Sequence, residues 1–227
     1  MRLFGMIAAA LALAGCVQQP VVMNRAPAAA GDAPMGYLVG TIGRAPNAAA
    51  PRYEISICNR DFGRIAAVQY KTAFLGMEPR QIDEEDFMGE SFALALPAGD
   101  YTICESSTTL GVPKELPKGA LGITKNRGQT GWHSGPVSIA LKVEAGKVSY
   151  IGRYKNYVNR VKILGVPGSI GTFWVVLDQQ AADLPQILKR DPTLANLPVV
   201  PGVPPKDQLP GPLFLPELPA DYKNSMW

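Results

Sequence analysis

The chain holds few residues of the types that carry out catalysis, and their spacing completes no catalytic motif. His133 is the only histidine, so one chain cannot supply a two-histidine metal site. Ser91 lies in the stretch Gly-Glu-Ser-Phe-Ala, residues 89–93, which partly matches a nucleophile elbow. That motif needs a helix after the serine, whereas a strand pattern follows here. No glycine-rich phosphate or dinucleotide motif is present. We therefore expect a protein without a cofactor that is not an enzyme, and a serine hydrolase is the weakest alternative.

Two charged stretches could bind ions or polymers. The acidic run Asp-Glu-Glu-Asp, residues 83–86, could meet Ca²⁺, but it lacks the spacing of an EF-hand and is interpreted as a solvated loop. The stretch 153–162 is basic with interleaved aromatic residues. On an alternating strand it would place Tyr154, Val158 and Val161 near the core and its charges outward. The alternative is contact with anionic lipid or polysaccharide.

A third candidate is the segment 107–131, which is rich in Gly and Pro and is predicted to lack regular structure. Its basic side chains are Lys114, Lys118, Lys125 and Arg127, and Glu115 is its only acidic one. Structureless loops longer than about 12–15 residues are uncommon and are usually functional or disordered. The segment is either a tolerated insertion or a binding loop. We expect a binding loop, and we place the contact with an acidic partner or an anionic envelope polymer in this segment.

The N-terminus has the layout of a secretory signal peptide. Met-Arg is followed by an apolar run over residues 3–13 and then by small residues. The run is about 11 residues long, short of the roughly 20 that a spanning helix needs. Residues 13–16, Leu-Ala-Gly-Cys, resemble the lipobox of bacterial lipoproteins. The resemblance implies that residues 1–15 are removed and that Cys16 is lipidated. The residue after Cys16 is Val17 and not Asp, which in the enterobacterial sorting rule resembles the signal for the outer membrane.

Charge and cysteine content limit the remaining function classes. The signal segment holds one of the 22 basic side chains, so the mature chain carries a net charge of +2, which gives no case for nucleic acid. With Cys16 assigned to lipid, Cys58 and Cys104 remain. In an oxidising compartment two such cysteines favour a disulfide.

Strand patterns dominate the chain beyond a lipidated N-terminus and flexible tether at residues 16–35. Residues 17–34 of this tether are rich in Ala and Pro and would reach about 55 Å when extended. Alternating or continuously apolar runs predict strands at residues 37–42, 53–58, 65–75, 92–96, 101–104, 137–143, 148–154, 160–166 and 172–177. Short turns rich in Gly between such strands are typical of an antiparallel sandwich.

One short helix and a proline-rich tail follow the strands. Asp183 is the expected N-cap of a helical segment at residues 179–196, with Pro185 in the first turn and Gln186 at capping-box spacing. Eight prolines between residues 198 and 219 predict an extended tail over residues 197–227. Leu213, Phe214 and Leu215 suggest that part of it docks on the body.

Two turn motifs suggest a family. Residues 96–103, Leu-Pro-Ala-Gly-Asp-Tyr-Thr-Ile, resemble the hairpin of prealbumin-like (transthyretin-like) β-sandwich domains. Residues 143–152 resemble the strand–turn–strand of small bacterial lipoproteins of uncharacterised function. The resemblance covers residues 36–178. It implies a fold and an address, and it supplies no catalytic residues.

The expected fold is therefore all-β: a single antiparallel sandwich of transthyretin/Ig-like type at residues 36–178, followed by the helix and the extended tail. The expected function is that of a lipid-anchored envelope protein, facing the periplasm from the outer membrane. It would bind or scaffold another envelope component without catalysis. The alternative is a module that binds cell-wall glycan or a small ligand.

Overall fold

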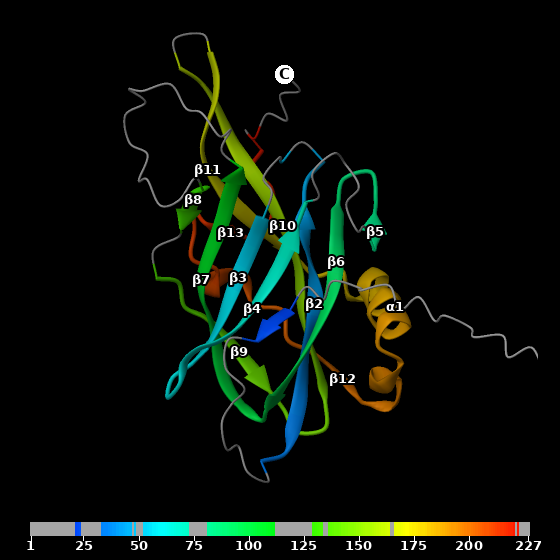
Figure 1. The fold of residues 1–227 in the computed structure, drawn as a ribbon. Coiled ribbons are helices and arrows are strands. Elements are labelled where there is room, and N and C mark those ends of the chain that lie inside the picture. Colours follow the sequence, from blue (N-terminus) through cyan, green and yellow to red (C-terminus); the bar gives the residue numbers. More distant parts are fainter. Residues whose placement is uncertain are drawn as a thin grey trace, which may run out of the picture.

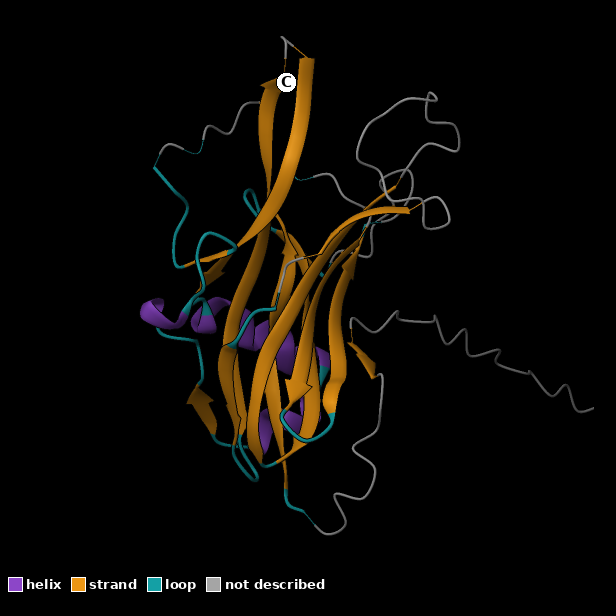
Figure 2. Cartoon of the chain, turned by 90° about the vertical axis from the view of Figure 1, so that its left-hand side faces the viewer, coloured by secondary structure: helices purple, strands orange, loops and turns teal. Residues whose placement is uncertain are grey.

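The computed structural model shows a mostly β structure with one α-helix, in two sheets (Figures 1 and 2). It describes residues 21–23, 33–46, 48, 52–72, 81–111, 129–133, 136–163, 166–220 and 222. The predicted all-β class is confirmed.

The first sheet, sheet A, is antiparallel throughout its described pairs. Its strands are β1 (Val21–Met23), β4 (Gly63–Lys71), β3 (Arg52–Asn59), β7 (Gly99–Gly111) and β8 (Gln129–His133), with β9 (Ile139–Val143) also paired to β7. Alternation sets its two faces, as the sequence predicts. Tyr53, Ile55 and Ile57 of β3 point into the core and are fully buried.

The second sheet, sheet B, is mixed. Its strands are β13 (Phe214–Leu215), β11 (Val166–Leu177), β10 (Val148–Ile163), β2 (Met35–Arg44), β6 (Met88–Pro97) and β5 (Ile82–Asp83), with β12 (Val199–Pro201) also paired to β10. The pairs β2–β10, β10–β12 and β11–β13 are parallel, which differs from the antiparallel prediction. Between β2 and β10 the chain crosses into sheet A and back twice, so the two strands are not joined by a hairpin and can run in one direction.

Strand β10 is one strand of 16 residues, where the sequence predicts two. Residues 155–159 contain neither glycine nor proline, so nothing interrupts the strand there. With β11 it forms a long hairpin that extends beyond the other strands at one end of the body (Figure 2).

The two sheets pack face to face through a shared core. Leu38 and Ile42 of β2 meet Tyr53 of β3, and the Tyr53 ring contacts Trp174 of β11 edge-on at 6.3 Å. The outer face of sheet B is covered by α1 (Gln180–Arg190), through a smaller cluster that includes Ile187.

The proline-rich tail folds back onto sheet B instead of remaining extended throughout. After a 3-10 turn at Pro192–Asn196, β12 pairs beside the first residues of β10. A second turn at Lys206–Gln208 leads to β13, which pairs with β11. Phe214 of β13 is fully buried and stacks on Trp174 at 6.4 Å. Prolines are tolerated here because these strands are short and lie at sheet edges.

Candidate functional site

Charged side chains are buried between sheet B and the segments that cover its outer face. Arg153 and Lys155 of β10 are 4% and 3% exposed, and Asp183 of α1 is not exposed at all. Removing charges from water is costly unless partners satisfy them. The partners of these three residues therefore define the candidate site.

A bulge in β10 places Arg153 on the α1 side of the sheet. The pairing of β10 with β2 shifts register between Tyr150 and Arg153, and Gly152 between them has a φ of 113°, a conformation that favours glycine. Because of the extra residue, Ile151 and Tyr154 both point into the central core although they are three positions apart. Arg153 thus shares the outer face with Tyr150.

The carboxylate of Asp183 is the centre of the site. Thr41 Oγ1 of β2 donates to Asp183 Oδ2 at 2.9 Å, and Tyr150 Oη of β10 donates to the same oxygen at 2.6 Å. Arg153 Nε donates to Asp183 Oδ1 at 3.1 Å, and a second guanidinium nitrogen also reaches that oxygen. One helical side chain therefore fixes α1 to two neighbouring strands.

Arg153 also bridges to the segment before β6. Its guanidinium donates to Glu84 Oε1 at 3.1 Å and lies over the Phe87 ring at 4.5 Å from the centroid. Burial opposes the charged form of Arg153, but the hydrogen bonds to Glu84 and Asp183 outweigh it and raise the pKa of the guanidinium. The arginine remains charged between two carboxylates.

These contacts bear on two predictions. The acidic run 83–86 is exposed, as predicted for a solvated segment, and in addition Glu84 binds Arg153 and Asp86 binds the Lys155 ammonium at 2.6 Å. Tyr154 does lie in the core as predicted, but Arg153 and Lys155 are not exposed outward. Alternation gives the face of the sheet, whereas burial depends on what covers that face.

The arrangement suits structural clamping better than chemistry. Asp183 already accepts from three side chains, so its oxygens have partners without a substrate. Burial and the hydrogen bond to Asp183 raise the pKa of the Tyr150 hydroxyl, so this group keeps its proton. A satisfied network of this kind rigidifies the elements that it joins.

Ser91 is also engaged structurally. It lies within β6 rather than at a strand-to-helix turn, and it is almost fully buried. Its hydroxyl donates to Gln81 Oε1 at 2.7 Å, its N–H donates to the same oxygen at 3.0 Å, and its carbonyl accepts from Arg190 at 2.7 Å. Side chains thus satisfy the main chain at this edge of sheet B. His133 belongs to β8 in sheet A, so the backbone places the two hydrolase candidates in different sheets.

Glu90, beside Ser91, is the described carboxyl with the largest upward displacement of pKa. Burial raises the pKa of Glu90 to about 6, although the positive charge of Arg190 acts in the opposite direction. The Arg190 nitrogen is 3.9 Å from Glu90 Oε2, too far for a hydrogen bond. No second titratable group of this kind lies beside it to complete an acid–base pair in the described contacts.

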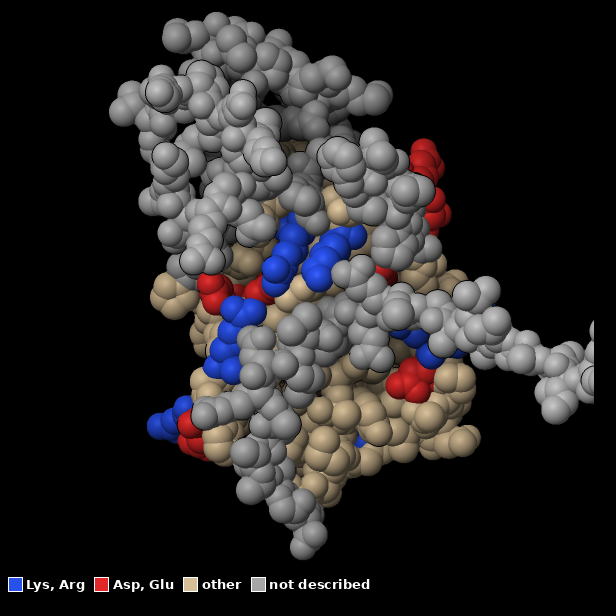
Figure 3. All heavy atoms as spheres, in the orientation of Figure 1, with Lys and Arg blue, Asp and Glu red and all other residues tan. Residues whose placement is uncertain are grey.

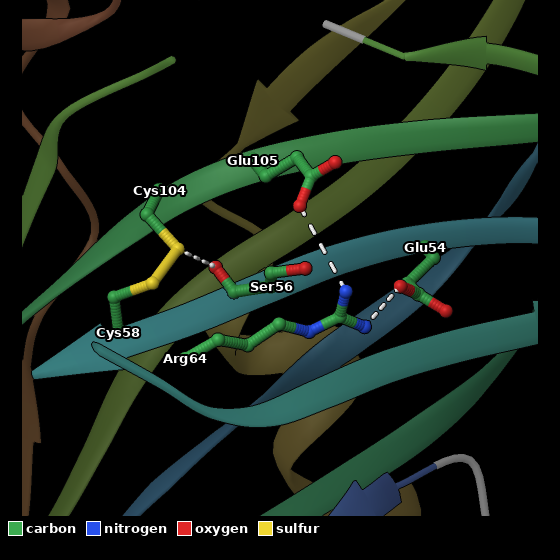
Figure 4. The surroundings of a disulfide bond; sticks show 6 residues. All are labelled: Glu54, Ser56, Cys58, Arg64, Cys104 and Glu105. Atoms are coloured by element: carbon green, nitrogen blue, oxygen red, sulfur yellow. Dashed lines mark hydrogen bonds and ion pairs between the residues drawn. A yellow bond between two sulfur atoms is a disulfide. The ribbon is translucent and has the colours of Figure 1, made fainter. Parts of the chain in front are cut away.

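The predicted disulfide between Cys58 and Cys104 is confirmed (Figure 4). It joins β3 to β7, and the Cα atoms are 5.8 Å apart. Ser56 pairs with Glu105 and Ile57 with Ile103, so Cys104 is the extra residue of a bulge. The bulge turns the Cys104 side chain toward Cys58, and Sγ of Cys104 lies 3.5 Å from the Ser56 carbonyl oxygen.

A row of charges lies beside the disulfide on the outer face of sheet A. Glu54 of β3 is buried and binds Arg52, Arg64 and Gln69, the last at 2.8 Å. Arg64 also approaches Glu105 at 3.8 Å. Figure 3 shows basic side chains beside acidic ones over the middle of this face. The charges largely compensate one another, so this row is not a strongly basic patch.

The predicted binding loop is only partly described, and its ends have regular structure. The segment from Ser107 to Gly111 is the end of β7, and it pairs with Gln129 to His133 of β8. The prediction that residues 107–131 lack regular structure is therefore wrong at both ends. The side chains Lys114, Lys118, Lys125 and Arg127 lie outside the described residues, as does Cys16.

No helix within the described ranges is both long and apolar enough to cross a bilayer. Likewise, nowhere in the described part of the chain do three or more His, Cys, Asp or Glu side chains gather as metal ligands.

No protein-family model and no curated protein matches the chain. One solved structure is similar in part, a crystal structure described as "Putative cell adhesion protein from Parabacteroides distasonis ATCC 8503". The match has 10% sequence identity and a TM-score of 0.27, and it covers 60% of this chain and 37% of that one. At this level it says nothing about the function or the family of the chain.

Sequence reasoning missed the Asp183 network, although one signal was present. Asp183 and Ile187 are four residues apart and are the two buried residues of α1, so a carboxylate lies on the apolar side of the helix. A charge in such a position requires a buried partner. Arg153 and Lys155, two positions apart and therefore on one face of β10, were the matching signal.

Proposed function

We propose that this chain is a lipid-anchored protein of the bacterial envelope that acts as a non-enzymatic binding or scaffolding module. The observation that carries the proposal is the arrangement of two hairpins. The β7–β8 pair and the β10–β11 hairpin extend toward the same end of the two-sheet body (Figure 2). A rigid body that presents loops at one end is a common platform for binding.

The polar groups of the body support this proposal over a catalytic one. Ser91 and Asp183, two side chains of catalytic type, have their hydrogen-bonding capacity taken up by neighbouring segments. The contacts hold α1, residues 81–87 and β6 in place, as a scaffold requires. We further propose that the two sheets form a single sandwich of transthyretin-like type, which the shared core around Trp174 supports.

The proposed address rests on the N-terminal sequence. The lipobox-like residues 13–16 would place a lipid on Cys16, with the body in the periplasm at the outer membrane. Cys16→Ser should then move the protein from the membrane fraction to the soluble fraction and abolish fatty-acid labelling. A variant that still pellets and still labels would show that the anchor lies elsewhere.

The partner can be sought from the loop between β7 and β8, residues 112–128. A photo-cross-linking residue at Lys118 should give adducts in intact cells, whereas the same residue at the exposed position Lys206 serves as the matched control. Adducts with an envelope protein from Lys118 alone would support the proposal. Equal adducts from both positions would refute this location, and an adduct with glycan would support glycan binding instead.

The charge of the same loop gives a second test. Reversing the charge of the four basic residues should lower the yield of the adduct and make that yield depend less on salt concentration, because charges that attract a partner are screened by salt. Equal thermal unfolding of the reversed variant and the unmodified protein is the control for an intact fold. Full adduct formation after the reversal would show that these charges do not contribute.

A further inference from the structure

Strand β1 joins the N-terminal segment to the folded body. Val21 to Met23 pair antiparallel with Val68 to Ala66 of β4, at the edge of sheet A (Figure 1). The three β4 residues opposite β1 are fully buried. The stretch expected to be a free tether therefore contains a point of attachment to the body.

The attachment changes the distance that a lipid on Cys16 allows. Four residues, 17–20, separate Cys16 from Val21, so the two Cα atoms can be at most about 18 Å apart. Without β1 the first described residue of the body would be Ala33, and the same calculation gives about 60 Å. Pairing of β1 shortens the available tether about threefold.

We propose that β1 is a latch that holds the β4 edge of sheet A against the membrane and releases the body to a longer tether when it detaches. This inference rests on the proposed anchor at Cys16. In the latched state the reach of about 18 Å is shorter than β4 itself, whose nine residues span about 30 Å. The body then lies with this edge toward the lipid headgroups.

The structure allows the latch to open without unfolding the body. Strand β1 is three residues long and lies at the end of the sheet order. On its other side β4 pairs with β3 along its length, from Lys71 opposite Arg52 to Gly63 opposite Asn59. Removing β1 leaves that ladder complete, and short edge segments are among the parts of a protein that open locally.

The test compares two proline pairs in the lipidated full-length protein on vesicles with an energy-transfer acceptor on the lipid headgroups. A donor dye is placed at Lys71, an exposed position at the end of β4. Val21→Pro/Val22→Pro removes the backbone N–H groups of two successive residues, so β1 loses a hydrogen-bond donor to β4 whichever of the two N–H groups faces that strand. The control pair Ala28→Pro/Ala29→Pro stiffens the tether outside β1. We expect loss of most energy transfer in the first variant and unchanged transfer in the second.

Hydrogen exchange separates the latch from the anchor. In soluble Cys16→Ser protein, Val21→Pro/Val22→Pro should speed exchange at those amides of Ala66, Ala67 and Val68 that are not bonded to β3. Unchanged exchange, or equal energy transfer in both proline variants, would overturn the latch. A third outcome separates the two ideas. If the unmodified protein does not bind vesicles, but exchange is faster in the Val21→Pro/Val22→Pro variant, then β1 pairs with β4 as described and the anchor and the membrane role of the latch are refuted.

Discussion

Replacing Asp183 with alanine should destabilise the body more than any comparable change at the surface. Asp183 is fully buried, and its removal leaves the Arg153 guanidinium and the Tyr150 hydroxyl without their shared acceptor. Breaking a buried ion pair at one partner costs about 3–5 kcal/mol. Glu84 retains part of the Arg153 interaction, so we expect about 3 kcal/mol. For a chain of this size that lowers Tm by roughly 6–12 °C.

Urea and thermal unfolding without reductant measure the loss, and two variants make the test specific. Glu144→Gln breaks the exposed pair with Lys147, which should cost far less because water and salt screen such a pair. The double variant Asp183→Leu/Arg153→Met removes both buried charges and should be more stable than Asp183→Ala alone. A loss in Asp183→Ala no greater than in Glu144→Gln, or a double variant that is worse than the single one, would refute the buried clamp.

Three further predictions concern other parts of the body. Burial raises the pKa of Glu90 to about 6, so the contribution of Glu90 to the free energy of unfolding is greatest below its ordinary pKa and falls as pH rises through 6. Glu90→Gln should remove this pH dependence. At pH 7.5 the variant should have a free energy of unfolding in urea about 2 kcal/mol higher than the unmodified protein. Gly152→Ala should cost about 1–3 kcal/mol because φ is 113° there, whereas Gly99→Ala, where a Cβ finds space, should be nearly neutral in the same assay. Reducing the bond between Cys58 and Cys104 should cost about 2–4 kcal/mol, and thiol alkylation of unreduced protein should label neither cysteine.

Period-two alternation was a reliable guide to the central strands. Tyr53, Ile55 and Ile57 were predicted to face inward, and they do. The same rule did not show that the chain continues as one strand through residues 155–159, because Lys155, Asn156 and Asn159 interrupt the apolar alternation there. Charged side chains are compatible with a strand when a neighbouring segment supplies their partners.

The helix shows why a local motif can be correct in kind and wrong in position. Asp183 precedes Gln186 at capping-box spacing, yet α1 begins at Gln180 and Asp183 lies inside it. The carboxylate binds Thr41 and Tyr150 instead of helix N–H groups. These partners are more than 30 residues away in sequence, so no local pattern could reveal the choice.

The tail shows the limit of composition as a guide. Its prolines favour extended coil, but burial of the Phe214 ring against Trp174 stabilises the docked conformation, and a free coil would leave this apolar surface in water. Parallel pairing of β12 and β13 likewise depends on where the chain returns after α1, which is a property of the whole topology. The disulfide was predictable because Cys58 and Cys104 were the two cysteines left after Cys16 had been assigned to lipid.

The position of Phe214 has a consequence for how the protein is made. The ring fills the inner core from a position 40 residues after Trp174, and the backbone N–H of Trp174 donates to the Leu213 carbonyl oxygen at 2.8 Å. The growing polypeptide therefore cannot complete its core until Phe214, which follows α1, has left the ribosome. Until then the side of the core around Trp174 stays uncovered in the nascent chain.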